Sequence, residues 1–241
     1  MVVKVYKTAE EIGKAAAAMY AAQVIKKPDS VLGFATGSTP IPTYKSIIEL
    51  YNEGVIDFSQ VTTFNLDEYS GLDGTHDQSY RYFMMQNLFN HINVRKDAIN
   101  IINGNSGDDE KACKEYEERI NKAGGIDLQI LGIGNNGHIA FNEPADYFPN
   151  ETHTVKLTES TIEANKRFFN SADEVPKYAL TMGIGSIMRA RSIILIATGS
   201  AKAQAIYDSV KGNITPNCPA SVLQLHNDVT FLVDEAAAAK L

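Results

Sequence analysis

A histidine, an asparagine and a glutamate lie close together in segment 131–144, which reads Leu-Gly-Ile-Gly-Asn-Asn-Gly-His-Ile-Ala-Phe-Asn-Glu-Pro. A histidine exchanges protons near neutral pH, and a nearby carboxylate can orient its ring. His138, Asn136 and Glu143 are therefore candidates for an acid–base site. Because Pro144 disfavours a long helix, we expect these side chains on an irregular loop.

The apolar run at 126–131 predicts a buried strand before this loop, and ligands of open α/β sheets bind at the carboxyl ends of strands. Gly132, Gly134 and Gly137 also match the dinucleotide fingerprint GxGxxG. That fingerprint requires a helix that opens at the third glycine, and a segment interrupted by proline does not clearly supply one. A glycine turn without catalysis is the other alternative, and the residues alone leave it open.

Asp67 is a second candidate, because it follows the apolar strand-like run 61–66. A carboxylate at a strand end can take a carbon-bound proton from a substrate held against it. The alternative is an aspartate that stabilises a turn, which is its commoner use after a strand. We expect the neighbouring Glu68 to be a structural partner.

The tetrapeptide Ala-Thr-Gly-Ser occurs twice, at 35–38 and at 197–200, each time after an apolar strand and before a predicted helix. Such a junction points backbone N–H groups and the positive end of a helix outward, which suits a phosphate. Capping by serine alone is the alternative. The first copy is better placed because Ser38 and Thr39 add two hydroxyls, and the second is followed by Lys202.

Segment 134–144 resembles the signature of the glucosamine-6-phosphate deaminase family, and segment 64–69 resembles a second motif of that family. The resemblance continues over essentially the whole chain, through residues 224–226. It implies conversion of glucosamine 6-phosphate and water to fructose 6-phosphate and ammonia, without a metal or an organic cofactor. The reaction would combine ring opening, aldose–ketose isomerisation and loss of the amine.

The same resemblance assigns roles to residues. Asp67 would be the enolisation base that moves a proton from C2 to C1, and His138 would open the sugar ring with support from Glu143. Asn136 falls where many members carry aspartate. A neutral amide can orient a ring, but it cannot stabilise an imidazolium by charge.

The resemblance also places the phosphate on a loop that carries Gly37, Ser38 and Thr39. The cations would be Arg167 and Lys202, and Thr36 would line the floor of the site. Residues 147–169 resemble the mobile lid of the family, in which His153 is a candidate substrate contact; we expect His226 to be structural.

Strand-like runs at 2–6, 31–35, 61–65, 126–131, 193–197 and 229–233 alternate with helix-like segments, including 80–90 and 109–122. A further helix is expected after the capping-box pair Thr8 and Glu11. This alternation predicts an α/β fold: a Rossmann-like, largely parallel sheet with helices on both faces. Because no linker-like segment interrupts the chain, we expect residues 1–241 to form a single domain.

The composition excludes several classes of protein. The net charge of −7 argues against general nucleic-acid binding, and no apolar run is long enough to span a bilayer. Cys113 and Cys218 are too far apart to indicate a disulfide framework or a zinc site. The N-terminus lacks a signal-peptide pattern, so we expect a cytoplasmic enzyme.

Two alternative functions remain open at this stage: a sugar-phosphate hydrolase like 6-phosphogluconolactonase, and a non-catalytic sugar-phosphate sensor. A sensor would be expected to lose Asp67 or His138, and both are present. Longer members of the glucosamine-6-phosphate deaminase family, which this sequence resembles, are hexamers activated by N-acetylglucosamine 6-phosphate. Since residues 234–241 leave room only for a short terminal helix, we expect a monomer or a small homo-oligomer.

Overall fold

The computed structural model describes residues 1–159, 162–163, 169 and 174–241. Its larger sheet has seven parallel strands in the order β1-β10-β9-β6-β2-β3-β5. These strands are β1 (Val2–Tyr6), β2 (Val31–Phe34), β3 (Thr62–Asn65), β5 (Ile99–Asn100), β6 (Leu128–Leu131), β9 (Ser192–Ala197) and β10 (Val229–Asp234). The smaller sheet, in the order β4-β8-β7, consists of β4 (Asp67–Tyr69), β7 (His153–Lys156) and β8 (Tyr178–Thr181).

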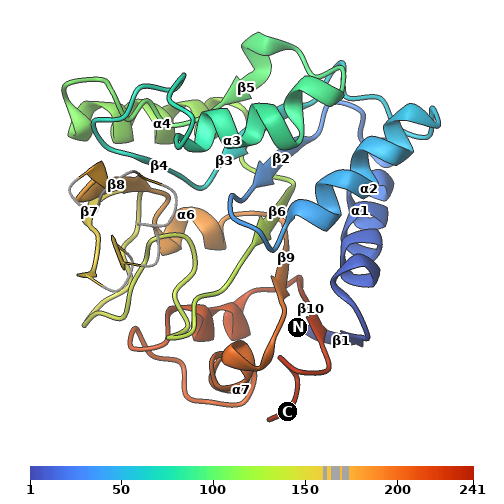
Figure 1. Ribbon diagram of the computed structural model, residues 1–241, viewed down its shortest axis with the longest axis vertical. Coiled ribbons are helices and arrows are strands. Elements are labelled where there is room, and N and C mark those ends of the chain that lie inside the picture. The colour runs from blue at the N-terminus through green and yellow to red at the C-terminus, as the bar shows by residue number, and fades with distance from the viewer. Residues whose placement is uncertain (160–161, 164–168, 170–173) are drawn as a thin grey trace.

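The α-helices of the described residues are α1 (Ala9–Lys26), α2 (Ile41–Asn52), α3 (Tyr80–Asn87), α4 (Asp109–Lys122), α6 (Ile184–Met188) and α7 (Ala203–Val210). Short 3₁₀ helices are η1 (Phe89–His91), η2 (Lys96–Ala98), η5 (Ser200–Lys202) and η6 (Pro219–Leu225). In Figure 1, α1 and α2 run side by side along one side of the larger sheet, and the two chain ends lie near β1 and β10. None of these helices has both the length and the apolar character needed to cross a bilayer.

Helices cover both faces of the larger sheet, as the sequence predicts. On one face, the Phe34 ring stacks on Tyr20 of α1 with the ring centroids 5.2 Å apart, and it also contacts Tyr44 of α2 edge-on. Phe64 pairs with Gly33 in the strand register, so its side chain points to the opposite face. There it meets the Tyr116 ring of α4 with the centroids 5.6 Å apart. The predicted fold class is therefore confirmed.

Local signals define several helix ends correctly. The Oγ1 of Thr8 caps α1 by accepting from the Glu11 N–H, and α4 has the predicted bounds. The predicted helix 80–90 is wrong at its end, because α3 stops at Asn87 and a 3₁₀ helix follows. At the C-terminus, where the sequence leaves room for at most a short helix, β10 extends to Asp234 and turns occupy 235–240.

The smaller, antiparallel sheet was not predicted, and it fixes the start of β4. Leu66 is the single residue between β3 and β4, and its carbonyl accepts from the Met182 N–H at 2.7 Å. Asp67 then pairs with Thr181 of β8. The chain therefore leaves the parallel sheet and enters the second sheet within two residues, with Asp67 at the junction.

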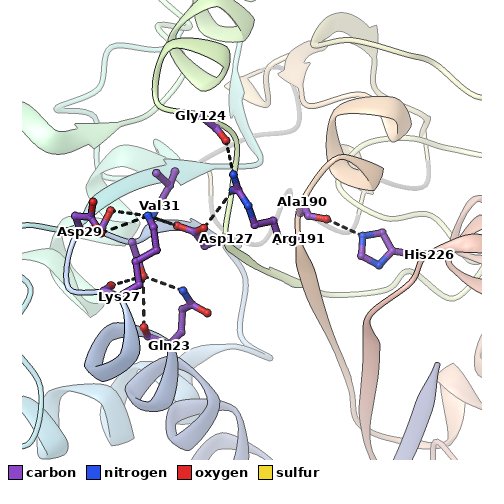
Figure 2. A network of polar contacts seen from close by, with 10 residues as sticks. Gln23, Lys27, Asp29, Val31, Gly124, Asp127, Ala190, Arg191 and His226 are labelled. Atoms are coloured by element: carbon purple, nitrogen blue, oxygen red, sulfur yellow. Dashed lines mark hydrogen bonds and ion pairs between the residues drawn. The ribbon is translucent and has the colours of Figure 1, made fainter.

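A buried carboxylate, that of Asp127, connects the amino ends of the central strands of the larger sheet. Figure 2 shows Lys27 and Arg191 reaching Asp127 from opposite sides, at 2.9 and 3.1 Å from its carboxylate oxygens. The same carboxylate accepts from the Val31 N–H at 2.7 Å. Because Val31 opens β2 while Asp127 and Arg191 directly precede β6 and β9, this network aligns the amino ends of the three central strands.

His226 belongs to the same region and is structural, as expected. One ring nitrogen, Nε2, lies 2.7 Å from the Ala190 carbonyl oxygen (Figure 2). The other, Nδ1, lies 3.1 Å from the Asp228 nitrogen. The carbonyl can only accept and the amide can only donate. The ring is therefore held as the tautomer with its hydrogen on Nε2.

Candidate active site

A cavity of about 500 Å³ lies at the carboxyl ends of the central strands. It is lined by the loop after β2, by Asp67, by the loop after β6, by the start of α3 and by the segment after β9. Seven predicted site residues line it together: Thr36, Gly37, Ser38, Thr39, Asp67, His138 and Lys202. Asn136 and Glu143 lie behind His138. Arg167 lies outside the described residues, so its predicted role stays a prediction.

The Asp67 side chain is only 7% exposed. Burial, with a smaller contribution from the negative charge of Glu68, raises the pKa of Asp67 to about 8. No hydrogen bond reaches its carboxyl group from the described residues, although the group lines the cavity. A carboxyl group with a pKa near neutrality and without protein donors is suited to exchange a proton with a bound molecule.

Glu68 points away from Asp67, because successive side chains of a strand alternate in direction. Its carboxylate accepts from the backbone N–H groups of Tyr69, Tyr80 and Arg81, each at 2.9 Å. Tyr80 and Arg81 open α3, where a negative charge is favourable. The expectation that Glu68 is a structural partner is confirmed: it anchors the start of α3 beside the cavity.

His138, Glu143 and Asn136 form a chain of contacts. The Nδ1 of His138 lies 3.2 Å from Oε1 of Glu143, whose Oε2 accepts from the Asn136 amide at 2.6 Å. The Asn136 oxygen in turn accepts from the backbone N–H of His138 at 3.2 Å. Asn136 therefore holds the carboxylate and the loop, and contacts the histidine ring only through Glu143. The His138 residue held in this way lines the cavity.

Glycines allow this loop to fold so tightly. A Cβ on Gly134 would lie 2.3 Å from a ring atom of His138, so only glycine lets the imidazole lie over this backbone. Gly137 has a φ of +85°, and a Cβ there would meet the Cys218 sulfur at 2.5 Å. The segment after Gly137 forms turns and not a helix, which contradicts the dinucleotide-fingerprint alternative.

The loop between β2 and α2 has the features of an anion site. Gly37 has a φ of +98°, a left-handed conformation that favours glycine. The helix that follows receives no side-chain cap and has no acidic residue in its first turn, although Pro40 and Ile41 at its start line the cavity. Pro40 and Pro42 carry no N–H, and the Ile41 N–H donates to the Ser38 carbonyl at 3.3 Å, so the donors for an anion here would be the N–H groups and hydroxyls of residues 37–39.

Lys202 supplies a positive charge to the same cavity. It is half-buried, and this burial lowers the pKa of its ammonium group. Among the residues that the structure describes, no acidic side chain pairs with it. A charged group that is partly desolvated without a partner gains from binding an anion.

The second Ala-Thr-Gly-Ser copy behaves differently from the first. The Gly199 N–H donates to both carboxylate oxygens of Asp234, at 3.0 and 2.9 Å. An internal carboxylate therefore occupies the position that a ligand anion would take. The identical tetrapeptides thus have different uses: the first borders the cavity with its own backbone, and the second carries Lys202 to it.

Aromatic residues that the sequence analysis did not single out form one wall of the cavity. The Tyr69 and Tyr80 ring centroids lie 4.8 Å apart, and Tyr80 stacks on Phe141 at 6.1 Å. Phe169, from the expected lid region, contacts Tyr69 edge-on. By contrast His153, a candidate substrate contact in the sequence analysis, lies on β7. It is not among the described residues that line the cavity.

Asn142 was also missed as a site-building residue. It is buried, and its amide donates to the Ile139 and Met182 carbonyls at 3.0 and 2.9 Å. These bonds tie the loop after β6 to the end of β8. The signal was present in the sequence, because Asn142 lies beside Glu143 in the motif, but a polar residue on a predicted loop gives no sign of burial.

No group of three or more side chains that could hold a metal ion occurs within the described part of the chain. The site that the structure does describe is therefore built from a buried carboxyl group, a histidine–carboxylate pair, a glycine- and hydroxyl-bearing loop and the ammonium group of Lys202.

Comparisons with known proteins identify the family of this chain. Residues 5–232 match the family model for glucosamine-6-phosphate isomerases/6-phosphogluconolactonase. The chain is 60% identical over 232 residues to a glucosamine-6-phosphate deaminase of Clostridium botulinum, strain Langeland, covering 96% of this chain and 95% of that one. It is 58% identical over 230 residues to a protein of the same name from Thermoanaerobacter sp., covering 95% and 91%.

Solved structures give the same result. One described as a monomeric glucosamine-6-phosphate deaminase superposes with a TM-score of 0.97 at 45% identity and covers 100% of both chains. The 6-phosphogluconolactonase of Trypanosoma brucei superposes with a TM-score of 0.77 at 18% identity, covering 100% of this chain and 98% of that one, and shares the fold. The chain belongs to the family of glucosamine-6-phosphate isomerases and 6-phosphogluconolactonases.

Proposed function

We propose that this protein is a glucosamine-6-phosphate deaminase, which converts glucosamine 6-phosphate and water to fructose 6-phosphate and ammonia. The observation that carries the proposal is the placement of Asp67, His138 and Lys202 in one cavity. The relatives that are 58–60% identical carry this name, which supports the same assignment.

In the first step, His138 takes the proton of the anomeric hydroxyl and returns a proton to the ring oxygen as the C1–O5 bond breaks. Glu143 lies 3.2 Å from Nδ1 and stabilises the imidazolium that forms transiently. Asn136 acts as a positioning residue, because it donates to Glu143 and accepts from the backbone of His138. The product of this step is the open-chain aldehyde.

Asp67 then takes the proton from C2, and the electron pair forms the double bond between C1 and C2. The C1 oxygen takes a proton from the ammonium group of the substrate, which gives a neutral enolamine. The same carboxyl group returns the proton to C1, which leaves a protonated imine at C2. Water adds to this carbon and ammonia leaves, giving the ketose. The buried carboxyl group suits this exchange, since its raised pKa allows it both to accept and to donate the proton.

The phosphate group would bind at the start of α2, where Gly37, Ser38 and Thr39 offer backbone N–H groups and two hydroxyls. Lys202 would neutralise part of its charge. We assign Arg167 as a second cation, on the resemblance alone. Thr36 would line the floor beneath the sugar.

One pair of assays tests the activity. The purified protein is given glucosamine 6-phosphate while ammonia release is measured, and then 6-phosphogluconolactone while acid release is measured. We expect ammonia from the first substrate and no acceleration of the second. Lactone hydrolysis without ammonia release would assign the chain to the other activity of its family. Neither reaction, with binding retained, would indicate a sensor.

We further propose that residues 1–241 form a single domain that works as a monomer or a small homo-oligomer in the cytoplasm. The monomer is supported by the solved relative of 45% identity that is described as monomeric. Light scattering reports the mass. Substrate titration with and without N-acetylglucosamine 6-phosphate should give hyperbolic curves that coincide, because a monomer with one site has no second site to couple.

A further inference from the structure

One buried tyrosine joins the two ends of the loop that carries Gly37, Ser38 and Thr39. The strand ladder of β2 ends at Phe34, and the loop begins after Ala35. Tyr44 belongs to α2, the helix that follows the loop. Its hydroxyl donates to the Ala35 carbonyl and accepts from the Ala35 N–H at 3.2 Å. A single side chain from the exit of the loop therefore holds the two peptide groups that flank Ala35 at its entrance.

Within the part of the chain that the structure describes, no other group is hydrogen-bonded to the Ala35 N–H or carbonyl. Tyr44 is fully buried and Ala35 is only 4% exposed, so both lie in the interior next to the cavity. Without the hydroxyl, both the donor and the acceptor of Ala35 would be left unpaired, which is costly in an interior. Burial also raises the pKa of Tyr44, so the group remains a neutral hydroxyl that can donate and accept at once.

We propose that Tyr44 is a positioning residue for phosphate binding: its hydroxyl fixes the two peptide groups that flank Ala35 and thereby aims the N–H groups and hydroxyls of 36–39 at the phosphate. The proposal rests on the function proposed above for this loop. A phosphate contact exists both before and during the reaction. Loosening it should therefore raise KM and leave kcat nearly unchanged.

Tyr20 provides a matched control. It is also fully buried, and its ring packs on the same Phe34 ring, with the centroids 5.2 Å apart against 5.9 Å for Tyr44. Its hydroxyl donates to the Gly33 carbonyl at 2.6 Å, which lies inside β2 and not at the loop. Both tyrosines thus brace the same strand from the same face, but only Tyr44 reaches the loop.

The test compares Y44F and Y20F with the parent in three measurements: chemical denaturation, steady-state kinetics with glucosamine 6-phosphate, and the calorimetric Kd for inorganic phosphate. Both variants should be less stable than the parent. For Y44F, KM and the phosphate Kd should rise by about fivefold or more, the scale of one lost hydrogen bond, while kcat stays within about twofold. For Y20F, all three constants should stay near the parent values.

Equal effects of the two variants on KM, or a fall in kcat at constant KM for Y44F, would overturn the proposal. If Y44F does not fold, amide hydrogen exchange of the parent decides instead. The Ala35 amide should be protected before phosphate is added, and an Ala35 amide that exchanges freely contradicts the proposal. A parent that releases no ammonia would refute the proposed function, whereas the phosphate Kd values would still test the role of Tyr44.

Discussion

The replacement Asp67→Asn should change the pH dependence of stability in a direction opposite to that of most aspartates. The pKa of Asp67 is raised to about 8 in the folded protein, chiefly by burial and secondly by Glu68. Between the ordinary aspartate pKa of about 4 and this value, the native state holds a proton that the unfolded state has lost. The free energy of unfolding therefore falls as the pH rises. The stabilisation is complete below the ordinary pKa and is lost as the pH approaches 8.

The magnitude follows from proton linkage. One extra proton on the native state gives a slope of about 1.4 kcal/mol per pH unit, or about 2.7 kcal/mol between pH 5 and pH 7. Asparagine has a similar shape and does not titrate, so this contribution is absent from the variant. Glu68 does not confuse the comparison, because Asp67 is mainly neutral over this range in the parent and always neutral in the variant.

The assay is urea denaturation of the parent and of Asp67→Asn at several pH values from 5 to 7, without substrate. The stability of the parent relative to the variant should fall steadily by the amount above. Asp57→Asn is the control: Asp57 is exposed and its pKa is lowered by the Ser59 N–H, so its difference from the parent should be flat over this range. If the Asp67→Asn curve also runs parallel to that of the parent, the carboxyl group is ionised in the folded protein and the reasoning fails.

Three further predictions concern the cavity. His138→Gln should slow turnover from the cyclic sugar more than turnover from the open-chain form, because only the cyclic form needs ring opening; an equal loss in stopped-flow assays of both forms would remove that role. Lys202→Ala should raise KM and the inhibition constant of inorganic phosphate with little change in kcat, and an unchanged phosphate constant would place the phosphate elsewhere. Gly134→Ala should lower kcat by displacing the His138 ring, which a Cβ would meet at 2.3 Å, and an unperturbed His138 ring signal in NMR spectra would contradict this cause.

Six of the seven parallel strands could be predicted, because most of them are apolar runs, whereas β5 has only two residues and was not predicted. β9 and β10 are almost wholly buried, and buried parallel strands have this composition. The smaller sheet could not be predicted. β4 has three residues, too few for a periodic pattern, and it exists because Asp67 pairs with Thr181, far along the chain.

For the site, the residue types were visible but many of their contacts were not. Asn136 and Glu143 were foreseen as neighbours of His138, yet the donation from Asn136 to Glu143 depends on the turn between them. The two identical tetrapeptides differ in use only because Asp234 binds one of them. Tyr44 could not be singled out, since no sequence pattern shows where a buried hydroxyl will find its partner.

The central claim is that Asp67 moves the proton from C2 to C1. The measurement that tests it most directly is ammonia release from glucosamine 6-phosphate by Asp67→Asn, under single-turnover conditions and with saturation checked by binding. Loss of a general base predicts a rate at least about 100-fold below that of the parent, with the Kd for inorganic phosphate unchanged. A variant that releases ammonia at nearly the parent rate would show that another group takes the C2 proton.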